Sequence, residues 1–320
     1  MKLAIIFSWL NQYGGAERVL EVVHDMYPQA PIYTSVYRPG ALPESYRHWD
    51  IRPSFMNRIP LARRKQQWFL FFYPLAFESF DLRGYDLVLS ISSGFAHGVL
   101  TGECARHISY CLTPPRFLWN YHAYIEREGA GRAVQPFMAS TLKNLRLWDV
   151  AAANRVDRFV AISRTVRERI AKHYHREADI IYPPVDTGTA ASTAATPQGD
   201  YYLVVSRLVP YKRIDLAVQA FSELGLPLKI VGEGRDRSAL QKMAGPNVEF
   251  LGFVRDDAAV RRLMAGCKAF VFPGEEDFGL TPVEAFSAGR PVIAYAGGGA
   301  LDTVEDGRTG TLFHAKTSAS

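Results

Sequence analysis

Short apolar runs alternate with amphipathic stretches along the first half of the chain. Helices are predicted from about Ala16 and directly after Ser163, whose hydroxyl suits a helix N-cap. Apolar runs separated by helices are typical of a parallel sheet covered on both faces. The runs that predict strands are LAIIF (3–7), YDLVLSIS (85–92), HISYC (107–111), RFVAIS (158–163) and DIIYP (179–183).

The alternation stops at residues 186–200, DTGTAASTAATPQGD, a small and polar stretch that predicts a linker or a long exposed loop. It then restarts, with helices predicted over about 211–224 and from about Asp256 and Thr281. The strands predicted here are YYLVVS (201–206), LKIVG (228–232), VEFLG (248–252), KAFVFP (268–273) and PVIAY (291–295).

The pattern therefore predicts two α/β domains, residues 1–185 and 201–320, each a doubly wound, Rossmann-like parallel sheet. A chain of 320 residues favours two cores over one. Ligands of such sheets bind at the carboxyl ends of the strands, so we expect a site in a cleft between two facing domains.

Composition adds limits on location and metal content. No apolar run reaches about 18 residues, so no spanning helix is predicted. Three cysteines do not suggest a disulfide framework and favour a reducing, cytoplasmic compartment. The segment CARHISYC, residues 104–111, has too few ligands for a zinc site, and buried or strand thiols are the preferred interpretation.

Charge is uneven along the chain. Residues 1–185 hold 23 Lys and Arg against 16 Asp and Glu (+7), whereas residues 186–320 hold 14 against 16 (−2). No nucleic-acid module is recognisable, so the basic half favours an anionic inner-membrane surface as partner over nucleic acid. LARRKQQWFLFFYPLAF, residues 61–77, fits either an interfacial segment or a core helix with a solvated basic end.

Phosphate-binding motifs of the common kinds are absent. VGEGRDR, residues 231–237, lacks the third glycine of a dinucleotide fingerprint, and neither a Walker loop nor an Asp-x-Asp pair occurs. SRLVPYKRID, residues 206–215, instead places Arg207 and Lys212 after a strand, where a guanidinium fork and an ammonium suit a diphosphate. A solvated basic turn is the alternative.

Two glycine-containing segments are further candidates. Gly14-Gly15 lies between the first strand and its helix, where backbone amides suit an anion, although a plain tight turn is also common. In EEDFGLTPVEAF, residues 275–286, Glu276 and Glu284 have seven residues between them. Both carboxylates can accept from sugar hydroxyls, and the amides of Phe278, Gly279 and Leu280 lie at a helix start where donors are unpaired.

This last region resembles the E-x7-E region of family-4 glycosyltransferases of the GT-B fold. SRLVPYKRID, VGEG, LGFV and GGGALDTVEDGRTG are similar to other landmarks of their nucleotide-sugar domain, in the same order over residues 200–315. In the first half, YGGAERV and HISYCLTPPRFLW resemble the subgroup of bacterial mannosyltransferases that assemble O-antigen and exopolysaccharide.

The resemblance implies a retaining, metal-independent transfer of a sugar, with mannose from GDP-mannose as our choice, to a glycan or lipid-linked acceptor. Arg207 and Lys212 would bind the diphosphate and stabilise the leaving charge. Glu276 with the amides of residues 278–280 would hold the sugar, and Glu284 the ribose. The remaining donor-binding positions implied are Gly14, Gly15, Gly232, Phe253 and Val254, with the last two beside the base.

Two departures from the family qualify this expectation. Leu112 stands where many relatives carry a histidine near the sugar, which leaves His97 and His122 as candidates for an acid, base or acceptor-binding role. The chain also ends soon after GRTGTLF, where relatives usually continue with helices. A sugar-nucleotide epimerase and a non-catalytic nucleotide-sugar-binding protein remain the alternative functions.

Overall fold

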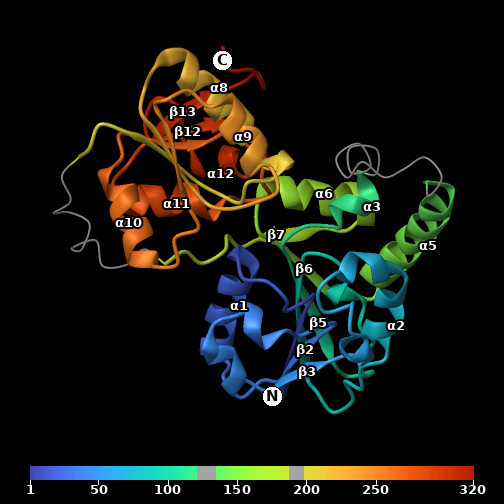
Figure 1. The fold of residues 1–320 in the computed structure, drawn as a ribbon. Coiled ribbons are helices and arrows are strands. Elements are labelled where there is room, and N and C mark those ends of the chain that lie inside the picture. Colours follow the sequence, from blue (N-terminus) through green and yellow to red (C-terminus); the bar gives the residue numbers. More distant parts are fainter. Residues whose placement is uncertain (121–134, 187–197) are drawn as a thin grey trace. The chain divides into compact units, whose positions relative to one another are not determined.

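The structure is a computed structural model, and it describes residues 1–120, 135–186 and 198–320 (Figure 1). The chain divides into two compact units, Met1–Pro184 and Val185–Ser320. Most of the predicted linker falls outside the described residues.

In the described part of unit 1, seven strands form one sheet in the order β3-β2-β1-β4-β5-β6-β7, and every neighbouring pair is parallel. The strands are β1 (Leu3–Phe7), β2 (Ile32–Thr34), β3 (Ile51–Pro53), β4 (Leu87–Ser92), β5 (Arg106–Cys111), β6 (Arg158–Ala161) and β7 (Ala178–Ile180).

Helices separate these strands in the chain. The α-helices described in unit 1 are α1 (Gly15–Met26), α2 (Tyr73–Glu78), α3 (Arg116–Trp119), α5 (Gln135–Ala153) and α6 (Arg164–Tyr174). The 3-10 helices are η1 (Pro39–Ala41), η2 (Glu44–His48), η3 (Phe55–Arg58), η4 (Gln66–Phe72) and η5 (Ala96–Gly98). Ser163 Oγ accepts a hydrogen bond from the Val166 amide at 3.1 Å, which confirms the predicted N-cap of α6.

Alternation along β1 builds the core of unit 1. Ala4 and Ile6 pack into a cluster with side chains of α2 and α5, while Ile5 and Phe7 point to the opposite face of the sheet. Figure 1 shows α1 on one side of this sheet and α2 on the other. Both faces are covered, as the apolar runs require.

Unit 2 contains, in its described residues, a six-stranded parallel sheet in the order β10-β9-β8-β11-β12-β13. Its strands are β8 (Tyr202–Val205), β9 (Leu228–Val231), β10 (Val248–Gly252), β11 (Phe270–Phe272), β12 (Val292–Tyr295) and β13 (Gly310–Phe313). Its helices are η6 (Pro210–Lys212), α8 (Ile214–Leu224), α9 (Arg237–Met243), α10 (Asp257–Gly266), α11 (Leu280–Ser287) and α12 (Ala300–Thr303).

Alternation again separates two cores. Leu203 and Phe270 pack with residues of α10, α11 and α12, whereas Val204 and Val271 pack with α8 and α9. The predicted fold class, two doubly wound parallel-sheet domains, is confirmed.

The structure also describes the cysteines, the acidic and histidine side chains near one another, and the lengths of the helices. Cys104, Cys111 and Cys267 are free thiols, and His107 donates to or accepts from Ser90 Oγ at 2.9 Å inside the sheet. Over the described ranges, no group of three or more His, Cys, Asp or Glu side chains lies close enough to hold a metal ion. In the same part of the chain, none of the helices has the length and apolarity needed to cross a bilayer.

Candidate functional site

The direction in which successive strands are added to the sheet of unit 2 reverses between β8 and β11. Strands β8, β9 and β10 extend to one side, and β11, β12 and β13 to the other, with Leu203 of β8 paired to Phe270 of β11. In a doubly wound sheet this point of reversal leaves a crevice at the carboxyl ends of the two central strands. The loops that follow β8 and β11 are therefore where a ligand is expected.

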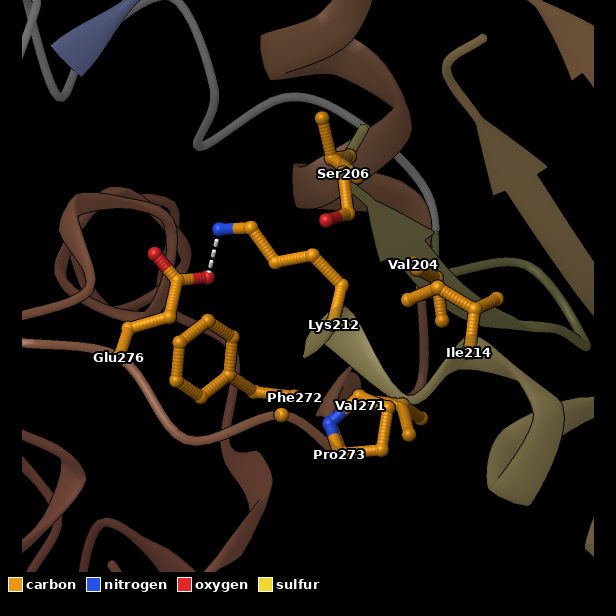
Figure 2. A pocket seen from close by; sticks show the side chains of 10 residues that line it. Val204, Ser206, Lys212, Ile214, Val271, Phe272, Pro273 and Glu276 are labelled. Atoms are coloured by element: carbon orange, nitrogen blue, oxygen red, sulfur yellow. Dashed lines mark ion pairs between the residues drawn. The ribbon is translucent and has the colours of Figure 1, made fainter. Parts of the chain in front are cut away.

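Lys212 and Glu276 meet at this point. Lys212 lies in the loop after β8 and Glu276 in the loop after β11, and Lys212 Nζ forms an ion pair with Glu276 Oε1 (Figure 2). Their side chains are 13% and 21% exposed, so the pair is mostly shielded from solvent. The sequence thus predicted two residues 64 positions apart that the fold brings into contact.

A small pocket surrounds this pair. Figure 2 shows Lys212 and Glu276 reaching toward each other on one side of it, with the Ser206 hydroxyl nearby. Its other walls are apolar or backbone and come from the ends of β8 and β11, the residues just after β11 and the start of α8: Val204, Val205, Ile214, Val271, Phe272, Pro273 and Gly274. Polar groups converging on an apolar wall are typical of small-molecule sites.

Arg207 lies in the same loop but on the outside. Its side chain is exposed, and its Nη2 donates to the Tyr211 hydroxyl at 2.7 Å. Lys212 Nζ lies 5.3 Å from the centre of the Tyr211 ring, so Tyr211 stands between the two cations. Two positive charges with different geometry therefore share one strand-end loop.

Close backbone packing fixes the position of this loop. Gly232, at the end of β9, has φ +137°, and a Cβ there would overlap the Ser206 carbonyl. Only glycine therefore lets the loop after β9 lie against the loop after β8, while the donor-binding role of Gly232 stays a prediction.

A second glycine supports Glu276, and the sequence interpretation did not single it out. Gly298 has φ +62°, and a Cβ there would overlap the Glu276 carbonyl. The neighbouring Gly299 amide donates to the same carbonyl at 2.8 Å. The GGG triplet at 297–299 was the visible signal, because consecutive glycines after a strand mark a close backbone approach.

Helix α11 begins one residue earlier than predicted, at Leu280, with Gly279 as N-cap at φ +84°. The Phe278 side chain is buried, and Leu280 is half-buried. Pro282 occupies the third helical position, where a missing amide costs little. Glu284 is half-buried and lies one turn after Leu280 on the same face of α11, but it does not line the pocket.

Phe253 and Val254 follow β10 and differ in their surroundings. Phe253 is 68% exposed, whereas Val254 packs against the core that contains Leu203. An exposed aromatic ring offers a flat apolar face, and the role of both residues beside a base stays a prediction.

Unit 1 carries the remaining predicted residues. Gly14 is the N-cap of α1 with extended backbone, φ −173°, and Gly15 is the first helical residue. A Cβ at Gly14 would make only an ordinary contact with Glu17, so its conformation does not demand glycine. Donor binding stays a prediction for Gly14 and Gly15, and likewise for residues 278–280 of unit 2.

His97 lies in the interior of unit 1. It is 2% exposed, its Nδ1 lies 3.2 Å from Ser92 Oγ, and its Nε2 lies 3.3 Å from Asp149 Oδ1. The rings of Trp148, Phe159 and Tyr174 surround it. This is the environment of a structural histidine. Leu112 is also buried, and His122 lies outside the described residues.

The fold and the site define a protein of two Rossmann-like domains, the second of which has a small pocket beside the Lys212–Glu276 ion pair. Two family descriptions match the chain: Glycosyltransferase Family 4 over residues 13–189, and Glycosyl transferases group 1 over residues 190–320. The first covers more than half of the chain. The chain belongs to glycosyltransferase family 4.

Curated relatives agree with this assignment. The chain is 34% identical over 244 residues to a GDP-mannose-dependent alpha-mannosyltransferase of Mycolicibacterium smegmatis. The aligned region covers 72% of this chain and 62% of that relative. The chain is 26% identical over 182 residues to an uncharacterized glycosyltransferase of Methanocaldococcus jannaschii, 55% of this chain and 50% of that protein. The chain thus spans about half to three fifths of these relatives.

Solved structures show the same fold at lower identity. The Anabaena protein HepE, solved with UDP, superposes with a TM-score of 0.68 at 18% identity, covering 99% of this chain and 87% of that one. Sucrose-phosphate synthase from Thermosynechococcus elongatus gives a TM-score of 0.69 at 16% identity, covering 100% and 87%. The fold is that of GT-B glycosyltransferases.

Proposed function

We propose that this protein is a retaining, metal-independent glycosyltransferase that moves a sugar from a nucleoside diphosphate sugar to a glycan or lipid-linked acceptor. The observation that carries the proposal is the Lys212–Glu276 pair at the reversal point of the second sheet. One site there offers a cation for a diphosphate and a carboxylate for sugar hydroxyls.

Charge and geometry give each residue a role. Lys212 has three N–H donors, so it can keep Glu276 and still donate to a phosphate oxygen. Arg207 supplies a planar fork for a second phosphate contact. As the bond to the sugar breaks, negative charge develops on the diphosphate, and the two cations stabilise it where it forms. Glu276 holds the sugar hydroxyls so that the reacting carbon stays in place.

Helix α11 and the loop after β10 complete the donor site in this proposal. Leu280 and the residues beside it present backbone amides at a helix N-terminus, which favours anionic or hydroxyl oxygens. Glu284 would bind the ribose diol, and the exposed Phe253 ring would lie against the base. Mannose from GDP-mannose is the proposed donor, supported by the 34% identity to the mycobacterial mannosyltransferase.

A thermal-shift screen of GDP-, UDP-, ADP- and dTDP-sugars on the intact chain tests this proposal. A donor at 100 times its Kd adds about 2.7 kcal/mol to the free energy of unfolding, so the matching nucleotide raises the melting temperature. Glu276→Gln should remove the sugar-dependent part of the shift, while Glu249→Gln, on a side chain 57% exposed in the same unit, should not. No shift with any of the four would refute the proposal.

A further inference from the structure

One stretch of unit 1 exposes apolar and basic side chains side by side. It runs from the turn before η4 through α2, at the outer side of the sheet (Figure 1). We call it the docking face and define it by its exposed side chains: Leu61, Arg63, Arg64, Lys65, Trp68, Phe71 and Leu75.

The opposite side of this stretch is firmly anchored. Ala62, Tyr73, Ala76 and Phe77 are fully buried and pack into the core of unit 1. The aromatic segment therefore combines both interpretations made from its sequence: part of it is core, and part of it faces outward. The exposed residues are held in place by their neighbours.

The large exposed apolar side chains of this stretch are close together in the chain. Trp68 and Phe71 both lie in η4, although the non-helical backbone of Phe69 (φ −113°, ψ 24°) interrupts this 3-10 helix between them. Leu75 lies in α2, which begins at Tyr73, directly after the end of η4. Trp68, Phe71 and Leu75 are 58%, 53% and 59% exposed. We call these three exposed apolar groups, which fall within one short stretch of unit 1, the apolar strip.

Positive charge borders this strip without acidic compensation. Arg63, Arg64 and Lys65 are exposed, and in the described part of the chain none of them forms an ion pair. Lys65 Nζ lies 4.2 Å from the Trp68 ring, so charge and aromatic surface are in direct contact. No acidic residue occurs between Asp50 and Glu78.

We propose that the docking face binds an anionic phospholipid surface, with Trp68, Phe71 and Leu75 entering the interface and the basic run meeting the headgroups. Aromatic and aliphatic side chains are stabilised at the acyl boundary, and cations beside them at negative headgroups. A second copy of the chain is a poorer occupant, because a symmetric contact would bring two basic runs together.

This proposal goes beyond the proposed sugar transfer and does not depend on it. Donor binding is measured without vesicles and vesicle binding without donor, so either can fail alone.

Flotation of the intact chain with vesicles tests the charge requirement. We expect binding to vesicles containing one-third phosphatidylglycerol and little binding to pure phosphatidylcholine. Each basic residue near the surface contributes a factor of about 5, so the triple variant R63Q/R64Q/K65Q should bind on the order of 100-fold more weakly. The matched control K143Q/R167Q/K172Q changes the same charge on exposed residues of unit 1 and should bind normally.

Tryptophan quenching by brominated acyl chains tests insertion. The chain has five tryptophans, and only Trp68 is exposed; Trp9, Trp49, Trp119 and Trp148 are half-buried. We expect quenching in the wild-type chain and its loss in Trp68→Phe, which retains the apolar strip and still floats. W68S/F71S/L75S should lose binding, whereas M26S/L147S/L224S, on residues equally exposed, should not.

Several results would overturn the proposal. Equal binding to neutral and anionic vesicles would show that the basic residues do not contribute to binding. Absence of quenching would show that Trp68 does not enter the acyl region. Full binding by W68S/F71S/L75S would place the contact elsewhere. A concentration-dependent dimer that this variant abolishes would assign the face to a second copy instead.

Discussion

Lys212 and Glu276 form an ion pair across the two central strands of the second sheet, although 63 residues separate them in the chain. Neither side chain is more than 21% exposed. A partly buried lysine would be costly without its carboxylate, and the carboxylate would be costly without the lysine. The two charges therefore compensate each other at the place where a diphosphate sugar is proposed to bind.

Replacing Lys212 by glutamine should weaken nucleoside diphosphate binding. The change removes one charge-assisted contact to phosphate, worth about 1.5–3 kcal/mol, and leaves Glu276 without its counter-charge. We expect the Kd for the matching nucleoside diphosphate, measured by calorimetry, to rise about 10- to 150-fold.

Lys229→Gln is the control for this experiment. Lys229 lies in the same sheet, and its Nζ pairs with Glu249 Oε2 at a distance of 3.5 Å. Neither residue lines the pocket. Lys229→Gln should leave the Kd unchanged. An unaltered Kd in Lys212→Gln with an intact fold would exclude Lys212 from the phosphate site.

Phe253→Ala should affect only ligands that carry a base. The ring is 68% exposed, so its removal costs little folding stability, but stacking of a base on an aromatic ring contributes about 1–3 kcal/mol. We expect weaker binding of the nucleoside diphosphate and unchanged binding of inorganic pyrophosphate. Equal losses for both ligands would mean that Phe253 acts on the phosphates or on the fold.

Gly298→Ala should disturb the Glu276 loop. The residue has φ +62°, and an added Cβ would overlap the Glu276 carbonyl, so the variant suffers both left-handed strain and a clash. We expect a loss of about 2–5 kcal/mol in the free energy of unfolding measured with urea, and weaker donor binding.

Gly307→Ala separates the two effects. Gly307 has φ +73° with nothing within 4 Å of the added Cβ, so it should lose only about 1–2 kcal/mol and keep donor affinity. Equal losses in the two variants would show that the contact with Glu276 is not important.

The strength of the local pattern decided what could be predicted. LAIIF and VEFLG became β1 and β10 with the predicted bounds, because apolar runs end there at polar residues or glycine. The strands β2 (IYT) and β3 (IRP) were not predicted, since neither stands in an apolar run as long as the one that marks β1. Helix α5, with 19 residues, was also missed.

The site shows the same limit. Lys212 and Glu276 were found from their segments, but their contact depends on β8 lying beside β11, which is a property of strand order. His97 stands in SSGFAHG, which is typical of a loop, and only the packing of α5 and α6 over it shows that it is buried beside Asp149. Non-local packing is not encoded in any one segment.

A buried histidine in unit 1 predicts how folding stability depends on pH. Burial, and next to it the field of His97, lowers the pKa of His107 from 6.5 to about 3. Between pH 6.5 and about 3, His107 is therefore protonated in the unfolded chain but neutral in the folded chain. This contribution to stability is complete above pH 6.5 and is lost as the pH falls toward 3, at up to about 1.4 kcal/mol per pH unit.

Urea denaturation at pH 7 and pH 5 measures this effect. His107 alone should lower the free energy of unfolding by about 2 kcal/mol between these two values. His107→Gln lowers stability at pH 7 but should show a correspondingly smaller drop on going to pH 5. His48→Gln, on an exposed ring, should keep the wild-type drop. If His107→Gln and the wild type lose equal stability, His107 must take up its proton in the folded state, and its ring would then be accessible to water.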